Sequence, residues 1–248
     1  MNLRSLFVLG VISLGAFGCA APAKQPRVRV ACVGDSITAG FGFVGVKDSY
    51  PAHLQALMGK GCDVQNFGVS ATTLVSEGDY PYTGRPQYKA ALDFRPEVLV
   101  VMLGTNDTKH PNDGSLDATN ASDNWRFRDK FVGEYEALIA SFRRANPAVR
   151  VYVCLPPPAN PGRWGINGKT ILNGLIPLVK RVAKEAHANL IDLYTPFKNK
   201  PQLIQADTVH PNVQGNEVIA SIVGQALSGK PVRKAGTTGA LAIPLIRS

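Results

Sequence analysis

Ser36 has the sequence context of a nucleophile. It follows an apolar run, residues 28–32, that predicts a buried strand, and the pattern changes at Ile37. The intervening Gly34 and Asp35 predict a sharp turn from that strand into a helix. A serine on such a turn exposes its hydroxyl beside unpaired backbone N–H groups and the positive end of a helix dipole. A serine that only caps the helix would occupy the same place, so Ser36 alone leaves both interpretations open.

His210 and Asp207 are candidates for the base that a nucleophilic serine needs. Such a serine passes its proton to a base, and a further group orients that base. The two residues lie three positions apart just before a predicted helix, and in a turn this spacing places a carboxylate against an imidazole. Asp192, at the end of a predicted strand, is the alternative partner of His210.

A tetrahedral oxyanion would need two or three fixed hydrogen-bond donors. The candidates are the backbone N–H groups of Ser36 and Gly68 and the side-chain amide of Asn106. Gly68 suits the role of a backbone donor because it has no side chain to block approach to its N–H group. Asp35 and Asp107 are expected to hydrogen-bond their own loops rather than take part in chemistry.

The elements that must position these residues alternate along the chain. Apolar runs predict strands over residues 28–33, 63–67, 98–103, 149–155 and 190–193. Helical spacing predicts helices over residues 50–58, 87–92, 127–145, 170–188 and 212–227. This alternation predicts an α/β fold, a three-layer α/β/α domain whose five parallel strands have a flavodoxin-like order. Because ligands bind at the carboxyl ends of such strands, we expect the candidate residues to meet at that edge.

The candidate residues form four blocks in a fixed order, and together they resemble the SGNH (GDSL) hydrolase family. The blocks are Gly34-Asp35-Ser36-Ile37, Gly68, Gly104-Thr105-Asn106-Asp107 and Asp207-x-x-His210. The resemblance implies Ser36 as nucleophile, His210 as base, Asp207 as its partner, and Ser36, Gly68 and Asn106 as oxyanion donors. It also implies a flavodoxin-like fold and no metal or other cofactor. Members of the family are esterases, lipases, thioesterases and carbohydrate deacetylases.

Aromatic residues in three loops bear on the substrate. Tyr82, Trp125 and Trp164 suit stacking on sugar rings, and His110 lies in the long polar loop after Asn106. Each aromatic residue could instead pin an irregular loop to the body of the domain. The loops are mostly polar and offer no apolar groove for a long acyl chain. The sequence therefore favours a serine esterase that removes short acyl groups, O-acetyl above all, from a small-molecule or polysaccharide substrate.

Two alternatives stay open. The ester could carry a longer acyl chain, as in a lysophospholipase or a thioesterase. The domain could also be an inactive carbohydrate-binding module, although such a module needs no Asp207–His210 pair.

The composition is that of an ordinary globular domain with a basic balance. The chain has 248 residues, 45% of them hydrophobic, and a formal net charge of +9. Part of this charge lies near the two ends, at Arg4, Lys230, Arg233, Lys234 and Arg247. No basic run interleaves with aromatic residues, so no nucleic-acid partner is expected. The sequence indicates no oligomeric state.

The three cysteines that follow Cys19 are expected to be buried and to pack as small hydrophobic side chains. Cys32, Cys62 and Cys154 lie in or beside predicted strands, and no spacing indicates a zinc site.

Residues 1–23 have the pattern of a signal peptide or lipoprotein leader. A positive start precedes a short apolar run, and residues 16–19 resemble a lipobox that ends in Cys19. A lipid on Cys19 would tether the protein to a membrane, and residues 21–23 offer a rival cleavage site. We therefore predict an exported, periplasmic or envelope-associated protein. The hydrolase domain is expected over residues 27–228, with a C-terminal tail over residues 229–248.

Overall fold

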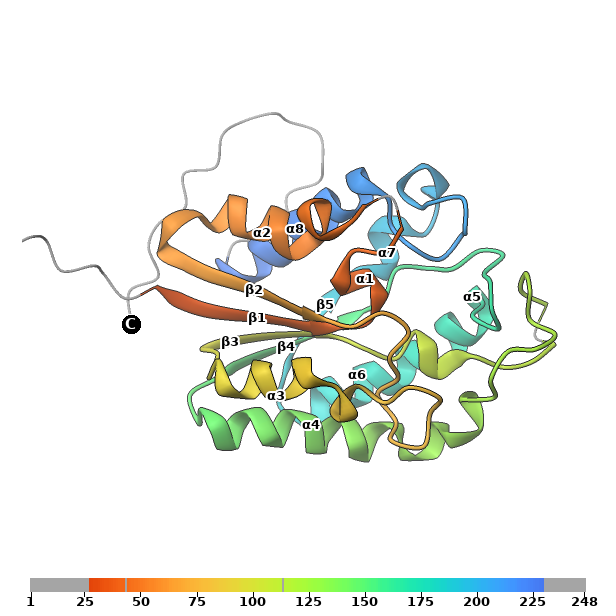
Figure 1. The fold of residues 1–248 in the computed structure, drawn as a ribbon, viewed down its shortest axis with the longest axis horizontal. Coiled ribbons are helices and arrows are strands. Elements are labelled where there is room, and N and C mark those ends of the chain that lie inside the picture. The colour runs from red at the N-terminus through yellow and green to blue at the C-terminus, as the bar shows by residue number, and fades with distance from the viewer. Residues whose placement is uncertain (1–26, 43, 113, 230–248) are drawn as a thin grey trace, which may run out of the picture.

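The computed structural model describes residues 27–42, 44–112 and 114–229 (Figure 1). The predicted leader over residues 1–23, its Cys19, and residues 230–248 of the predicted tail lie outside this range. Among the described residues, no helix combines the length and apolar character needed to cross a membrane.

A parallel sheet of five strands forms the centre of the fold, in the order β2-β1-β3-β4-β5. Every neighbouring pair is parallel. The bounds are β1 Val28–Gly34, β2 Cys62–Gly68, β3 Val98–Met102, β4 Arg150–Leu155 and β5 Asn189–Asp192. The strands therefore follow the predicted flavodoxin-like order. In the register, Gly34 lies opposite both Gly68 and Met102, so the ends of three strands meet at one edge.

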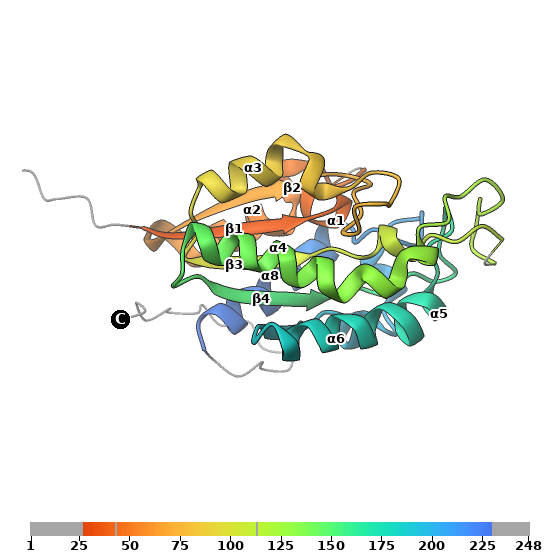
Figure 2. The ribbon, with the colours of Figure 1, turned by 90° about the horizontal axis from the view of Figure 1, so that it is seen from below.

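Helices cover both faces of the sheet (Figures 1 and 2). α2 and α8 lie on one face, and α3, α4 and α6 lie on the other. The bounds are α1 Ser36–Ala39, α2 Tyr50–Met58, α3 Pro86–Asp93, α4 Phe131–Ala145, α5 Gly168–Thr170, α6 Ile176–Glu185, α7 Tyr194–Phe197 and α8 Val213–Leu227. The three-layer α/β/α architecture expected from the alternation of strands and helices is confirmed.

The hydrophobic core has two parts, one on each face of the sheet. Successive side chains of a strand point to opposite faces, so Ala31 and Val33 pack into one part and Val30 and Cys32 into the other. β3 is buried along its whole length, as expected for a central parallel strand. The three described cysteines, Cys32, Cys62 and Cys154, are free and buried, as predicted.

Two predicted helices are interrupted. The predicted helix over residues 127–145 begins as a 3₁₀ segment, Trp125–Lys130, and becomes α-helical only at α4. The predicted helix over residues 170–188 consists of α5, a π-helical segment Ile171–Leu175, and α6. Pro177, near the start of α6, has no N–H to donate to the carbonyl four residues earlier. The π-helical segment lies just before this proline.

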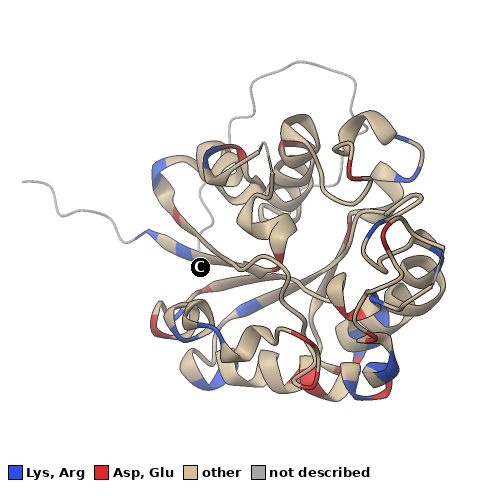
Figure 3. Ribbon diagram, turned by 45° about the vertical axis from the view of Figure 1, so that its right-hand side comes forward, with Lys and Arg blue, Asp and Glu red and all other residues tan. Residues whose placement is uncertain are grey.

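Charged residues of both signs are spread over the described surface. Figure 3 shows basic and acidic residues on the same helices and loops rather than one continuous basic face. Several pairs make surface ion pairs, for example Lys89 with Asp93 and Arg181 with Glu185. This distribution is unlike the basic stripe that marks a nucleic-acid interface.

Candidate active site

Ser36 is the first residue of α1, directly above the end of β1. The N-cap of α1 is Asp35, whose side chain accepts a hydrogen bond of 3.0 Å from the Ile37 N–H. The alternative that Ser36 caps the helix is therefore wrong, because Asp35 fills that role. The turn also needs Gly34, since a Cβ there would lie 2.7 Å from the Met102 carbonyl oxygen of β3. Glycine thus lets the strand ends close up beneath Ser36.

Ser36, His210 and Asp207 form a continuous chain of hydrogen bonds. The Ser36 Oγ and His210 Nε2 atoms are 2.8 Å apart, and His210 Nδ1 lies 2.8 Å from Asp207 Oδ2. Ser36 is 7% exposed and His210 is 5% exposed, so both bonds are shielded from water. The alternative partner Asp192 accepts hydrogen bonds from the N–H and Oγ1 of Thr195 instead.

The other oxygen of Asp207 is held by the backbone. The N–H groups of Val209 and His210 both donate to Asp207 Oδ1 at 2.9 Å. Burial tends to raise the pKa of Asp207, but the hydrogen bonds from the side chain and backbone of His210 and from Val209 outweigh it and hold that pKa below its usual value. Asp207 is therefore charged and accepts the Nδ1 proton. This leaves Nε2 of His210 as the acceptor that faces the Ser36 hydroxyl.

A cavity of about 200 Å³ opens at Ser36, and we call it the Ser36 pocket. Its walls combine polar groups with aromatic and aliphatic side chains. Its lining residues are Ser36, Phe41, Ser70, Ala71, Thr105, Asn106, Lys109, Trp164, Ile166, Val209 and His210.

The structure brings Asn106 into the Ser36 pocket but does not place Gly68 there. Gly68 ends β2, and its N–H already donates to Asn66 Oδ1 at 2.9 Å. A Cβ at Gly68 would lie 2.9 Å from Ala39 Cα, so glycine serves the close packing of β2 against α1. The expectation that Gly68 is an oxyanion donor is therefore wrong.

Ala71, which the sequence did not single out, brings a backbone N–H to the Ser36 pocket. It lines the Ser36 pocket, and its N–H has no hydrogen-bond partner among the described residues. Its φ of 66° is left-handed, a conformation that residues with a Cβ adopt only at a cost. The nearby Asn106 Nδ2 donates to the Thr72 carbonyl at 3.1 Å, which ties the Asn106 amide to this same loop.

Asp107 holds the loop that carries Ala71. Its Oδ1 accepts from the N–H of Val75 and its Oδ2 from the N–H of Leu74, each at 2.9 Å. The expectation that Asp107 bonds its own loop is therefore wrong, whereas Asp35 does so, through Ile37. Burial raises the pKa of Asp107 to about 7, against the lowering effect of these N–H donors. Burial likewise raises the pKa of Asp35 to about 6.

Among the predicted substrate contacts, only Trp164 lies in the Ser36 pocket. Its ring centroid is 6.0 Å from that of His210. The sequence reasoning missed Phe41, whose ring stacks on His210 with centroids 4.2 Å apart and an angle of 28° between the rings. Tyr82 is fully buried, and its hydroxyl donates to the Phe67 carbonyl at 2.9 Å, so its expected contact with substrate is wrong.

Trp125 and His110 lie outside the Ser36 pocket. Trp125 packs against Gly174, where a Cβ would clash with its ring, and it lines a separate surface hollow with Arg128. His110 is exposed, and its Nδ1 lies 3.1 Å from Asp123 Oδ1. Neither residue contacts the space in front of Ser36 in this structure.

Within the described part of the chain, no group of His, Cys, Asp and Glu side chains is arranged to hold a metal ion.

The fold and these side chains together define a class of protein. A parallel α/β/α sheet with a serine, a histidine and an aspartate joined at its carboxyl edge is an arrangement of serine hydrolases. The GDSL-like lipase/acylhydrolase family matches residues 32–218, which is most of the chain. The chain belongs to this family of ester hydrolases, as the four sequence blocks predicted.

A curated relative extends the comparison. An acetylxylan esterase of Xylanibacter ruminicola is 36% identical to this chain over 222 residues. The match covers 82% of this chain and 44% of that relative, so the chain spans less than half of the relative's length.

Solved structures share the fold. The lipase/acylhydrolase from Enterococcus faecalis has a TM-score of 0.62 at 23% identity, and the match covers 84% of this chain and 100% of that one. A carbohydrate acetylesterase family member from Sinorhizobium meliloti has a TM-score of 0.61 at 21% identity, covering 82% and 98%. The acetyl xylan esterase AlAXEase has a TM-score of 0.58 at 23% identity, covering 81% and 100%. At these identities the likeness concerns the fold alone.

Proposed function

We propose that this chain is a serine esterase that removes short acyl groups, above all O-acetyl groups, from carbohydrate. The observation that carries the proposal is the hydrogen-bonded chain from Ser36 through His210 to Asp207. Ser36 and His210 line a cavity of about 200 Å³.

In this mechanism the Ser36 Oγ attacks the acyl carbon of the ester. His210 Nε2 takes the Ser36 proton and then gives it to the leaving alcohol oxygen as the C–O bond breaks. Water then attacks the acyl group on Ser36, with His210 first accepting the water's proton and then returning a proton to Ser36 Oγ. Asp207 keeps the imidazole oriented and stabilises its charged form through both steps.

The backbone N–H of Ser36, the backbone N–H of Ala71 and the Asn106 amide would stabilise the oxyanion. Ala71 takes the place that the sequence assigned to Gly68. Each such donor contributes on the order of 3 kcal/mol to transition-state stabilisation in a shielded site. Asn106 is 5% exposed, which favours a strong contribution because little water competes for its amide.

The size of the Ser36 pocket supports a short acyl group. Sites for drug-sized ligands commonly have volumes of roughly 300–1,000 Å³, and the Ser36 pocket holds about 200 Å³. Phe41, Trp164, Ile166 and Val209 wall it. A long acyl chain would have to displace these side chains or extend along the surface.

A carbohydrate as the alcohol part of the ester is supported by a relative. The curated relative that is 36% identical to this chain is an acetylxylan esterase. The aromatic faces of Phe41 and Trp164 beside His210 would suit a sugar ring.

The test is the hydrolysis of nitrophenyl acetate, butyrate, octanoate and palmitate, with release of acetate from acetylated xylan measured in parallel. We expect activity on acetate and butyrate, release of acetate from xylan, and none of these with Ser36→Ala. A preference for octanoate or palmitate would replace the proposal with a lysophospholipase or thioesterase. No turnover of any ester would instead favour an inactive carbohydrate-binding module.

We also propose that residues 1–23 direct export and that a lipid on Cys19 tethers the protein to the envelope. The pattern of the leader supports this proposal. Mass spectrometry of the mature N-terminus tests it: a lipid-modified Cys19 is expected. A mature chain that begins after residue 23 would retain export but overturn the anchor, and a chain that begins at Met1 would overturn both.

A further inference from the structure

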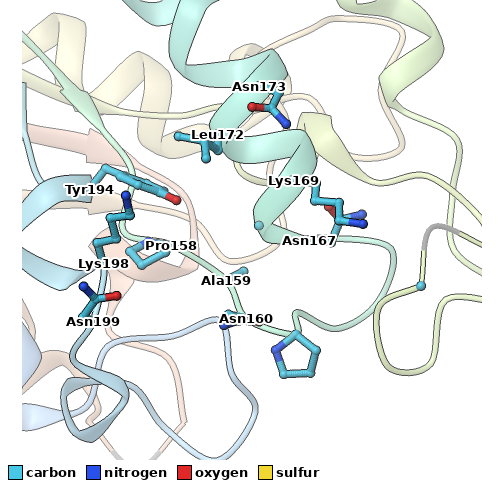
Figure 4. Close-up of a pocket in the computed structure, with 13 residues that line it drawn as sticks. Pro158, Ala159, Asn160, Asn167, Lys169, Leu172, Asn173, Tyr194, Lys198 and Asn199 are labelled. Carbon is cyan, nitrogen blue, oxygen red and sulfur yellow. The ribbon is translucent and has the colours of Figure 1, made fainter.

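A second hollow shares loop 156–167 with the Ser36 pocket: residues 158–161 of the loop line the hollow, and residues 164 and 166 line the pocket. One part has a volume of about 520 Å³ and the adjoining part about 420 Å³. The two parts share Pro158, Asn160, Lys198 and Asn199, so they are continuous, and we call them together the basic groove. Figure 4 shows Tyr194, Lys198 and Asn199 on one side of the larger part and Lys169, Leu172 and Asn173 on the other.

The charge of the basic groove is uncompensated. Lys169, Lys198 and Lys200 line it, and no aspartate or glutamate is among its lining residues. No ion pair joins these lysines to a carboxylate within the described part of the chain. Lys109, which lines the Ser36 pocket, is by contrast paired with Asp79. Three free ammonium groups around one hollow favour a ligand that brings its own negative charges.

The remaining polar groups of the basic groove suit sugar hydroxyls. Asn160, Asn173 and Asn199 line it, and an amide side chain can both donate to and accept from a hydroxyl. Tyr194 adds an aromatic ring to the same wall as Lys198. We propose that the basic groove binds the carboxylate-bearing sugars of an acidic, uronate-containing carbohydrate.

The placement of the lysines favours carboxylates that are spread along a chain. Lys169 lies in α5, whereas Lys198 follows α7 on the other side of the larger part of the groove. Lys200 lines the adjoining part. A single phosphate would need several donors converging on one point, and these ammonium groups come from opposite walls instead.

Loop 156–167 connects the basic groove to the Ser36 pocket. Pro158 and Asn160 line the groove, whereas Trp164 lines the Ser36 pocket. The Asn160 N–H donates to the carbonyl of Thr208, the residue directly after Asp207, at 3.2 Å. A glycan held in the groove would therefore pass close to His210, where its ester meets Ser36. This inference rests on the proposed esterase function and specifies its substrate as an acidic glycan.

The test measures binding in the Ser36→Ala background, so that no ester is consumed. Calorimetry compares a glucuronate-bearing xylo-oligosaccharide with a neutral xylo-oligosaccharide of the same length. We expect the acidic ligand to bind more tightly. We also expect Lys169→Gln/Lys198→Gln to weaken its binding by about tenfold or more, because two charge-assisted contacts are lost. Rising salt should weaken the acidic ligand alone.

The matched control is Lys60→Gln/Lys184→Gln, which removes the same charge from exposed lysines outside the groove. The control should bind the acidic ligand like its parent. The proposal would be overturned if the acidic and neutral ligands bound equally well. It would also be overturned if both double variants weakened binding of the acidic ligand equally, or if a sulfated oligosaccharide bound more tightly than the glucuronate-bearing one. If the wild-type chain does not hydrolyse nitrophenyl acetate, the proposed esterase function is wrong. The binding measurements would still test whether the basic groove binds acidic glycans.

Discussion

At the scale of single residues, Asp207 determines both how His210 is oriented and which of its nitrogens carries a proton. Asp207 Oδ2 lies 2.8 Å from His210 Nδ1, and the N–H groups of Val209 and His210 hold Oδ1. These bonds keep the carboxylate charged and fixed, so the side chain acts as a rigid acceptor. The proposed role of His210 as a base depends on this acceptor.

Asp207→Asn should therefore reduce kcat for nitrophenyl acetate on the order of 10³-fold or more, because an amide stabilises the wrong tautomer of His210.

The pairing of Asp207 with His210 also makes the stability of the fold depend on pH. The folded-state pKa of Asp207 is lowered, so its stabilising contribution is full above the unfolded value of about 3.9 and is lost as the pH falls through the folded-state pKa.

Urea unfolding of the wild type and of Asp207→Asn across this pH range measures that contribution. The difference in unfolding free energy should be largest near neutral pH and should shrink below about pH 4. A difference that grows as the pH falls would contradict the assignment of Asp207 as a charged acceptor.

At the scale of elements, two loops meet at the Ser36 pocket and are bonded to each other. The loop after β3 supplies Asn106 and Asp107, and the loop after β2 supplies Ala71. Asp107 accepts from Leu74 and Val75, and Asn106 donates to the Thr72 carbonyl. The proposed oxyanion donors on the two loops are therefore positioned as one unit.

Asp107→Asn should lower the free energy of unfolding by about 1–3 kcal/mol, because its NH₂ group would face a buried N–H donor. It should also lower kcat for nitrophenyl acetate, since the loop that carries Ala71 loses its anchor. Asp93→Asn, an exposed change on α3, is the control and should alter stability by about 0.5 kcal/mol at most. Equal stabilities of the two variants would contradict the anchoring role of Asp107.

The sequence predicted the elements better than the loops, for a physical reason. Buried parallel strands are apolar along their whole length, so β3 stands out in the sequence. The left-handed conformation of Ala71 has no signal in the local sequence. Tyr82 stands among glycines and prolines, yet its loop folds it onto the sheet, where its hydroxyl finds the Phe67 carbonyl. Burial of a loop residue depends on packing that periodicity does not reveal.

At the scale of the whole molecule, the parallel sheet collects residues that are far apart in the chain. Ser36 and His210 are separated by 174 positions, yet their side chains are 2.8 Å apart. This happens because each strand ends at the same edge and each following loop contributes there. Loop 156–167, which follows β4 at this edge, contributes residues both to the Ser36 pocket and to the proposed glycan site.

Among the hydroxyl groups of the described residues, Ser36 is the one that we propose as an activated nucleophile. The most direct measurement is the intact mass after reaction with a fluorophosphonate, followed by mapping of the labelled peptide. We expect one adduct per chain on Ser36, slow labelling of His210→Ala, and no adduct on Ser36→Ala. Equal labelling of Ser36→Ala, or an adduct on another residue of the wild type, would contradict it.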